Sequence, residues 1–319
     1  MNRILISAVL LAASVFASAQ TKSTALTGEE LLPAVYAKVD SVRAGRNLLT
    51  FTFITDTHTG AVVDIDRNSR ENIDLFVKAA NEVADFAGFG GDLFTAYQCP
   101  HDSAVVFLSR AAGLYSRLQV PFLAARGNHD ANAKVDPSQV VKQYEYYSLF
   151  SALRKDVVED GQTPDCNYFY KDFDEHKVRV VVLNEYDSGK DEKEYFSDRQ
   201  LEWLRTSALS FDGKDQPSQW SVIFISHFVP KSASHPFNKL VKEFQERGTV
   251  IAAISGHFHE DRFTDANGYN AITVTTGIAT AKQVGTPDAI AFDVFVLDPA
   301  SRTLNEFRVG RGSDRTYTY

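Results

Sequence analysis

Five short apolar runs divide the chain, and polar residues follow each of them directly. The runs span residues 48–54, 83–89, 120–124, 222–225 and 250–254. Apolar runs of this length are typical of strands that are buried on both faces of a sheet. Because the ligand sites of open α/β sheets lie at the carboxyl ends of the strands, we expect the polar residues after the five runs to lie together.

Segments with helical spacing of apolar residues alternate with these runs, at residues 69–86, 102–118 and 139–153. Ser197 and Gln200 resemble a capping box that opens another helix, and Pro236 is placed in the first turn of a helix that ends before Gly248. Further strands are expected at residues 167–173, 178–183, 271–276, 290–297 and 303–309. Strands that alternate with helices and end in a run of strands predict an α/β fold with two packed mixed sheets flanked by helices.

The polar residues after the five runs form motifs that contain five of the eight histidines. In chain order the motifs are Asp56-Thr57-His58, Gly91-Asp92, Gly127-Asn128-His129-Asp130, Ser226-His227 and Gly256-His257-Phe258-His259. Any one of them also occurs by chance in turns and at strand ends, but all of them in one order at strand ends indicate a two-metal site. Carboxylate, imidazole and amide ligands without a thiolate suit divalent Mn, Fe, Zn, Co or Ni, and the sequence does not choose among these ions.

Asp92 is the candidate for a ligand shared by both ions, because a bridged pair of ions about 3.5–4 Å apart can act as a clamp on a phosphoryl group. His257 and His259 are two residues apart, so on an extended segment they would project to the same side and face adjacent ions. Asp56 and His58 have the same spacing. Asn128 would add an oxygen ligand without adding charge.

The ordered motifs resemble those of the calcineurin-like metallophosphoesterase superfamily, from about residue 47 to the end of the last strands. The resemblance implies a four-layer αββα sandwich and hydrolysis of phosphate esters by in-line attack of a hydroxide that bridges the two metals. It implies that the first metal is bound by Asp56, His58, Asp92 and His259, and the second by Asp92, Asn128, His227 and His257. It also makes His129 a residue that contacts the substrate phosphate or protonates the leaving oxygen, with Asp130 orienting it.

The residues after Asp92 limit which subfamily of this superfamily the chain resembles. The residues after Asp92 match neither the serine/threonine protein phosphatases nor the purple acid phosphatases, which place a tyrosine where this chain has Thr95. Arg126 either grips a substrate phosphate, as a planar fork of donors can, or pairs with a surface carboxylate. Phe94 and Tyr97 are candidates for a wall of the cleft.

The three remaining histidines are expected to have structural positions. His101 and His235 are interpreted as solvated loop residues, and His176 as part of a hairpin turn. The aromatic residues of the segment 139–153 are expected to belong mainly to the core.

The net charge of the chain limits the classes of molecule that it is expected to bind. The net charge of −8 argues against nonspecific binding of nucleic acid. The family resemblance implies a small phosphate ester as the substrate. The candidate ligands are spread from Asp56 to His259, so one site requires most of the chain, and residues 47–319 are expected to form one catalytic domain.

The first residues have the features of a signal peptide. A basic start, an apolar zone too short to span a bilayer and small residues before Gln20 predict cleavage after Ala19. Residues 20–46, with a helix expected at 29–42, are interpreted as a lead-in. We therefore expect an exported protein, periplasmic or secreted, without a transmembrane segment after cleavage.

The two cysteines, Cys99 and Cys166, are expected to form a disulfide if the chain enters an oxidising compartment, the alternative being two buried free thiols. Two alternatives to a phosphomonoesterase stay open: a phosphodiesterase or nucleotide hydrolase that uses the same site, and a noncatalytic binder of phosphate or metal. The sequence specifies neither the natural substrate nor the oligomeric state.

Overall fold

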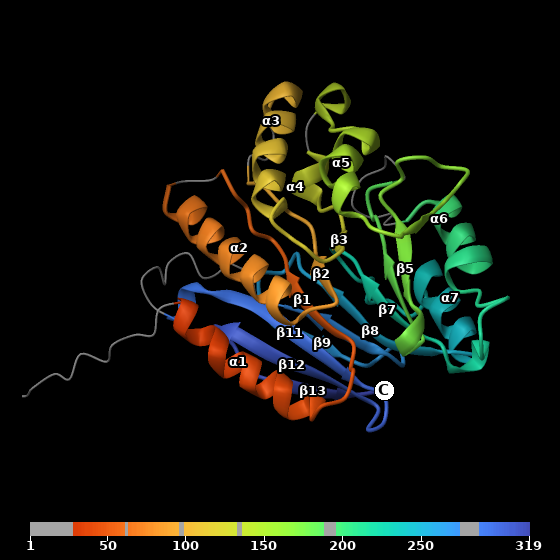
Figure 1. Ribbon diagram of the computed structural model, residues 1–319. Coiled ribbons are helices and arrows are strands. Elements are labelled where there is room, and N and C mark those ends of the chain that lie inside the picture. The colour runs from red at the N-terminus through yellow and green to blue at the C-terminus, as the bar shows by residue number, and fades with distance from the viewer. Residues whose placement is uncertain (1–27, 61–62, 96–98, 133–135, 188–195, 275–286) are drawn as a thin grey trace, which may run out of the picture.

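Two mixed sheets pack face to face between helices in the computed structural model (Figure 1). The structure describes residues 28–60, 63–95, 99–132, 136–187, 196–274 and 287–319. The predicted signal peptide lies outside these residues. Among the helices of the described residues, none is long and apolar enough to cross a membrane.

The first sheet has six strands in the order β13-β12-β11-β1-β2-β3. Three parallel strands form one half, β1 (Thr50–Ile54), β2 (Phe86–Phe89) and β3 (Phe122–Ala124). Three antiparallel strands form the other half, β11 (Ala291–Asp298), β12 (Thr303–Gly310) and β13 (Arg315–Thr318). The chain thus returns from its last third to pair with its first strand.

The second sheet has seven strands in the order β4-β5-β6-β7-β8-β10-β9. Its parallel centre consists of β6 (Val178–Val182), β7 (Ser221–Ile225), β8 (Thr249–Ser255) and β10 (Asn270–Thr273). Antiparallel strands lie at its edges, β4 (Val158–Glu159) and β5 (Phe169–Phe173) on one side and β9 (Arg262–Thr264) on the other.

Helices cover the outer faces of both sheets (Figure 1). The six-stranded sheet is covered by α1 (Gly28–Arg43), α2 (Val63–Val83), α3 (His101–Ala112) and α5 (Gln143–Phe150). The seven-stranded sheet is covered by α6 (Asp198–Trp203) and α7 (Pro236–Gln245). A third apolar core lies between the sheets, where Phe51 stacks on Phe86 and Phe295 at 4.7 and 4.9 Å between ring centroids. The predicted four-layer sandwich is confirmed.

Of the two hydrogen bonds of the capping box predicted at the start of α6, one is present. Ser197 Oγ accepts a hydrogen bond from the Gln200 N–H at 3.0 Å, as a capping residue does. The Gln200 side chain, however, is hydrogen-bonded to the backbone of Asn184 and not to that of Ser197. The Gln200 side chain therefore joins α6 to the end of β6 and does not complete the capping box.

Helix α1 belongs to the packed body, although residues 20–46 were expected to be a lead-in only. Leu32, Val35 and Val39 are buried in the core over the six-stranded sheet. Arg46 continues this contact, because its guanidinium donates hydrogen bonds to both carboxylate oxygens of Asp298 at 2.9 and 3.0 Å. The packed unit therefore begins before residue 47.

The predicted disulfide is wrong, and both cysteines are free thiols. Cys99 packs against the core on the outer face of the six-stranded sheet. Cys166 is buried in the core on the outer face of the seven-stranded sheet, where its thiol donates to the Tyr168 carbonyl at 3.2 Å. The two cysteines thus pack in different cores.

His101 is not a solvated loop residue but the first residue of α3, and it joins that helix to α5. Its Nδ1 lies 3.0 Å from Asp102 Oδ1 and its Nε2 3.0 Å from Glu145 Oε2. His235 likewise has a structural task, since its Nδ1 accepts a hydrogen bond from the Phe237 N–H at the start of α7. His176 lies in the turn between β5 and β6, as predicted.

We expect the tether at His101 to make stability depend on pH. Hydrogen bonds with Glu145 and Asp102 raise the pKa of His101 above its usual value. The protonated ring therefore stabilises the fold fully below its unfolded-state pKa of about 6.5, and this stabilisation is lost as the pH rises through the folded-state pKa. The wild type should exceed His101→Asn in free energy of unfolding by more at mildly acidic pH than at alkaline pH, as measured by denaturant unfolding. An equal difference across the pH range would contradict this assignment.

Candidate metal centre

The predicted metal ligands meet at the carboxyl ends of β1, β2, β3, β7 and β8, and most of them have an uncommon backbone conformation. The five residues with positive φ are Asp56 (48°), His58 (46°), Asp92 (58°), His257 (71°) and His259 (55°). Such left-handed conformations cost a non-glycine residue on the order of 1–3 kcal/mol and gather at functional sites. The expectation that His257 and His259, and likewise Asp56 and His58, project from extended segments is therefore wrong, because all four have a left-handed backbone conformation.

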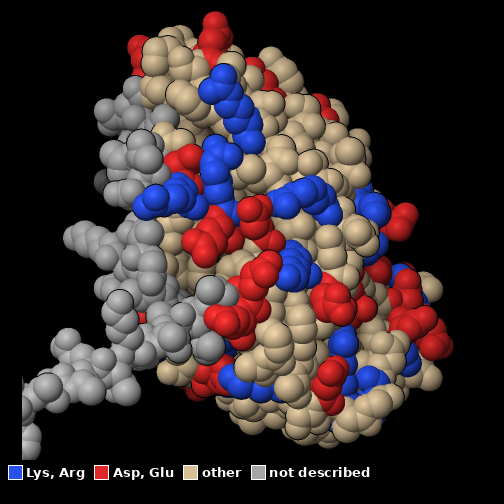
Figure 2. Space-filling view, turned by 60° about the vertical axis from the view of Figure 1, so that its left-hand side comes forward, with Lys and Arg blue, Asp and Glu red and all other residues tan. Residues whose placement is uncertain are grey.

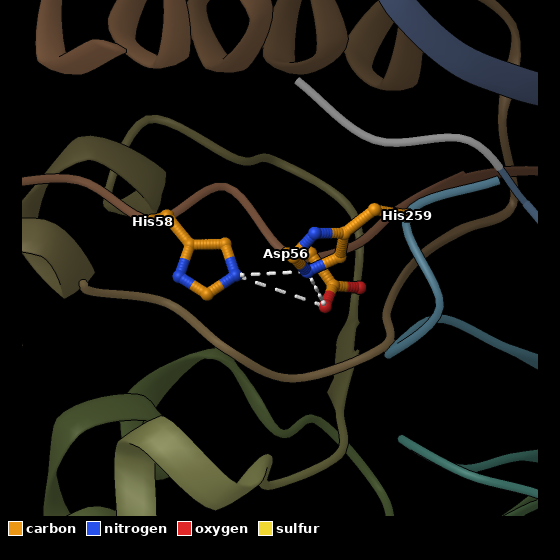
Figure 3. Close-up of side chains that lie close together, drawn as sticks. All are labelled: Asp56, His58 and His259. Carbon is orange, nitrogen blue, oxygen red and sulfur yellow. Dashed lines mark hydrogen bonds and ion pairs between the residues drawn. The ribbon is translucent and has the colours of Figure 1, made fainter. Parts of the chain in front are cut away.

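Asp56, His58 and His259 form the first cluster (Figure 3). His58 Nε2 lies 3.3 Å from His259 Nε2 and 3.8 Å from Asp56 Oδ1. His259 Nε2 lies 3.2 Å from the same carboxylate oxygen. Figure 3 shows both imidazole rings turned toward the Asp56 carboxylate, so the three ligand atoms surround one point.

Asn128, His227 and His257 form the second cluster. Asn128 Oδ1 lies 3.0 Å from His227 Nε2 and 3.2 Å from His257 Nδ1, and the two nitrogens are 3.1 Å apart. The other ring nitrogen of His227, Nδ1, lies 2.7 Å from the Gly90 carbonyl oxygen. Donating its proton there leaves the Nε2 lone pair of His227 available for a metal.

Asp92 lies between the two clusters. Its Oδ2 is 3.7 Å from His58 Nε2 in the first cluster and 3.4 Å from His227 Nε2 in the second. Its Oδ1 accepts a hydrogen bond from the His129 N–H at 2.8 Å, which fixes the orientation of the carboxylate. The position of Asp92 is that expected of a bridging ligand.

The donor atoms fit divalent ions. Ligand atoms about 2.1 Å from a tetrahedral ion are about 3.4 Å apart, which is close to the spacings within each cluster. Two imidazole nitrogens only 3.1 or 3.3 Å apart are favourable when a cation or a proton lies between them. Buried carboxylates and imidazoles with N and O donors suit borderline transition-metal ions.

The electrostatic field at the site also favours cations. Burial opposes ionisation of Asp56, but hydrogen bonds with His259 and His58 outweigh it and hold its pKa well below the usual value. For Asp92, burial is likewise outweighed by the charge of His227, and its pKa falls to about 2. Burial lowers the pKa of His227, yet the charge of Asp92 raises it to about 10. The two buried carboxylates are thus ionised beside the histidines.

Two motif glycines allow the ligand loops to approach one another. A Cβ atom on Gly127 would overlap the Asp92 carboxylate, and one on Gly256 would overlap the Asp56 carboxylate. Glycine is therefore needed at both positions for close packing, independently of backbone conformation.

The sequence model of the calcineurin-like phosphoesterase family matches residues 49–261, which is well over half of the chain. The chain belongs to the calcineurin-like phosphoesterase family. It is thus a metallophosphoesterase, a hydrolase of phosphoric ester bonds. No curated protein matches the chain.

Two solved structures share the fold of this metallophosphoesterase. A dimetal phosphatase from Danio rerio is 19% identical, with a TM-score of 0.65 over 85% of this chain and 99% of that chain. GAP50, the anchor in the inner membrane complex of Plasmodium, is 14% identical, with a TM-score of 0.50 over 85% of this chain and 88% of that chain. At these identities the likeness concerns the fold.

His129 lies beside the ligands with part of its ring accessible. Its side chain is 22% exposed, and its Nε2 lies 4.0 Å from Asp92 Oδ2. Its ring stands edge-on to that of His58, with 4.7 Å between centroids. Burial lowers the pKa of His129, against the charge of Asp92. His129 is thus accessible to a substrate, and its ligand atom also lies close to those of His58 and Asp92.

Asp130 holds the ligand loops together, whereas it was expected to orient His129. Its Oδ2 accepts hydrogen bonds from the N–H groups of Asp92 and Gly127 at 2.8 and 2.9 Å, and its Oδ1 accepts one from Leu93 at 2.7 Å. Burial raises the pKa of Asp130 to about 7. This side chain therefore positions the turn that carries Asp92.

Arg126 and Phe94 do not line the site. The Arg126 side chain is buried, donates to the Val141 carbonyl and lies 5.8 Å from the centroid of the Tyr146 ring. This position supports neither the phosphate-gripping role nor pairing with a surface carboxylate. Phe94 is fully buried beside Phe107, and Tyr97 lies outside the described residues.

Glu185 is a site residue that sequence reasoning missed. It is 3% exposed, and its Oε1 accepts hydrogen bonds from Ser226 Oγ at 2.9 Å and from the Phe228 N–H. These partners flank His227 on both sides, so Glu185 fixes the backbone that presents this ligand. Burial raises the pKa of Glu185 to about 7.

We expect Glu185→Ala to weaken metal binding through His227. Losing a partner that orients a metal ligand typically lowers metal affinity 10–100-fold, and losing the hydrogen bond from the part-buried Phe228 N–H costs about 0.5–1.5 kcal/mol of stability. Glu185→Gln keeps an acceptor oxygen and should restore much of the metal affinity and of the free energy of unfolding. Metal titration and denaturant unfolding measure the two effects, with Glu202→Ala at an exposed position of α6 as the control. Unchanged affinity in Glu185→Ala would exclude this role.

Proposed function

We propose that this metallophosphoesterase is an exported enzyme, periplasmic or secreted, that uses two divalent transition-metal ions to hydrolyse small phosphate esters. The position of Asp92 Oδ2 between two three-residue clusters is the observation that carries the binuclear assignment. Export is supported by the pattern of residues 1–19. The ions are Mn, Fe, Zn, Co or Ni, by the donor types.

When bound, the two ions supply Lewis-acid stabilisation of the phosphoryl group and activate water for in-line attack. The protein's own part is to orient the ligands and the substrate. Asp130 and Glu185 hold the loops of Asp92 and His227, and the tight turns fix the remaining ligands. His129, partly exposed at the edge of the clusters, donates a hydrogen bond or a proton to the leaving oxygen.

The substrate is proposed to be a monoester. A diester or a nucleotide would use the same clusters but needs room for a second substituent, and a noncatalytic binder would hold phosphate without turnover. A net charge of −8 disfavours a nucleic-acid substrate.

A screen of chromogenic mono- and diesters with each of the five metals tests this proposal. We expect metal-dependent hydrolysis that a chelator abolishes, with monoesters preferred over diesters. Faster turnover of diesters would replace the monoesterase assignment by the phosphodiesterase one. Tight phosphate binding with no turnover under any metal would refute the catalytic proposal.

A further inference from the structure

A cavity of about 390 Å³ lies between α2 and α3, next to the loop that carries His58. Three arginines line it, Arg67 and Arg70 from α2 and Arg110 from α3. Figure 2 turns the α2–α3 side of the molecule forward and shows Lys and Arg side chains in its upper half, with Asp and Glu side chains next to them. Two helices that are separate in the sequence therefore bring positive charge to one cavity.

The described lining of this arginine cavity contains more cationic than anionic side chains. Asp66 is the carboxylate among the described lining residues, and its Oδ2 accepts a hydrogen bond from Arg70 Nε at 2.7 Å. Its Oδ1 accepts one from the Gly60 N–H at 2.8 Å. Arg110 has no acidic partner among the residues that the structure describes. In a protein with a net charge of −8, a cavity with three arginines and one carboxylate is a local exception.

Two residues that directly follow the metal ligand His58 in the sequence line the arginine cavity. Thr59 and Gly60 line it and follow His58 directly, so the Cα atoms of Gly60 and His58 are at most about 7.6 Å apart. Thr59 is paired with the Asp92 loop, since its N–H donates to the Leu93 carbonyl and its own carbonyl accepts from the Thr95 N–H, each at 3.0 Å. A group held in the cavity would thus lie beside the loop that carries His58.

We propose that the arginine cavity binds a second anionic group of the substrate, so that the preferred substrate is a phosphate ester with a phosphate or carboxylate at its other end. This inference rests on the proposed function. Guanidinium groups bind both oxyanions through paired N–H donors, and the Phe107 ring in the cavity wall can pack against an apolar spacer.

The direct test compares ligands that differ only in the distal group. A series of alkanediol bisphosphates and matching alkyl monophosphates is assayed for kcat/KM, and the non-hydrolysable bisphosphonates and monophosphonates are assayed for binding to the metal-loaded protein. The wild type should prefer the doubly anionic ligand at one spacer length. Arg110→Ala should reduce that preference on the order of tenfold, through KM, because one charge-assisted contact is lost.

Arg117→Ala is the matched control, because it removes an exposed arginine that pairs with Asp74 outside the cavity. It should keep the wild-type preference, and Arg110→Lys should restore part of it by restoring the charge. Both phosphonates bound equally by the wild type, or equal preferences in Arg110→Ala and Arg117→Ala, would overturn the inference.

Two further outcomes distinguish this inference from a failure of the proposed function and from binding of a free anion. If no ester is hydrolysed by the wild type, the proposed function fails, while phosphonate binding still decides whether the cavity selects a second anion. If inorganic phosphate or sulfate changes monophosphate turnover in the wild type but not in Arg110→Ala, and the distal group has no effect, the cavity binds a free anion and the substrate inference is overturned.

Discussion

Replacing Asp92 by alanine should remove metal from both clusters and reduce turnover on the order of 10³-fold or more. Asp92 Oδ2 lies within 3.7 Å of a ligand nitrogen in each cluster, so its loss affects both. Metal charge stabilisation of the transition state amounts to several kcal/mol, and each 1.36 kcal/mol corresponds to about tenfold in rate. Elemental analysis after desalting and a phosphatase assay measure the two effects.

Asp92→Asn separates the charge of this residue from its shape. The amide oxygen can still accept the hydrogen bond from the His129 N–H, so the loop should stay folded while the bridging charge is lost. Asp215→Ala removes an exposed carboxylate in the loop before β7 and serves as the control. Full metal content in Asp92→Ala would exclude the bridging role.

The second large effect is expected for His129, where metal binding and turnover should separate. His129→Ala should retain metal yet lose activity by roughly 10²–10⁴-fold, the usual contribution of a general acid. The loss should be smaller for esters with good leaving groups, because a stable leaving oxygen needs little protonation. Metal analysis together with rates for a series of leaving groups measures this.

His176→Ala, in the turn between β5 and β6, is the matched control for His129→Ala. Because His129 also lies close to His58 and Asp92, loss of metal in His129→Ala would make it a ligand instead. Wild-type rates with poor leaving groups would exclude any catalytic role.

The strands that carry the ligands could be predicted because they are buried on both faces. Such strands consist of continuous apolar runs, and β1, β7 and β8 were placed within two residues of their observed bounds. The sequence did not reveal β4, β9 and β13, which are two to four residues long and lie at sheet edges. Edge strands with one solvated face lack an apolar run.

The grouping of the candidate ligands followed from motif order, whereas their local geometry did not. Positive φ at a non-glycine residue such as Asp56 or His257 has no sequence signal. Side-chain direction is equally hidden, so Arg126 and Phe94, each next to or near a ligand in sequence, point into the core. Glu185 could have been found, because it follows an apolar run just as the other site residues do.

Anomalous scattering from crystals of the Mn²⁺-loaded protein can locate the bound ions. We expect two peaks about 3.5–4 Å apart, one beside Asp56, His58 and His259 and the other beside Asn128, His227 and His257, with the Asp92 carboxylate touching both. A single peak, or two peaks that do not share Asp92, would contradict the binuclear assignment.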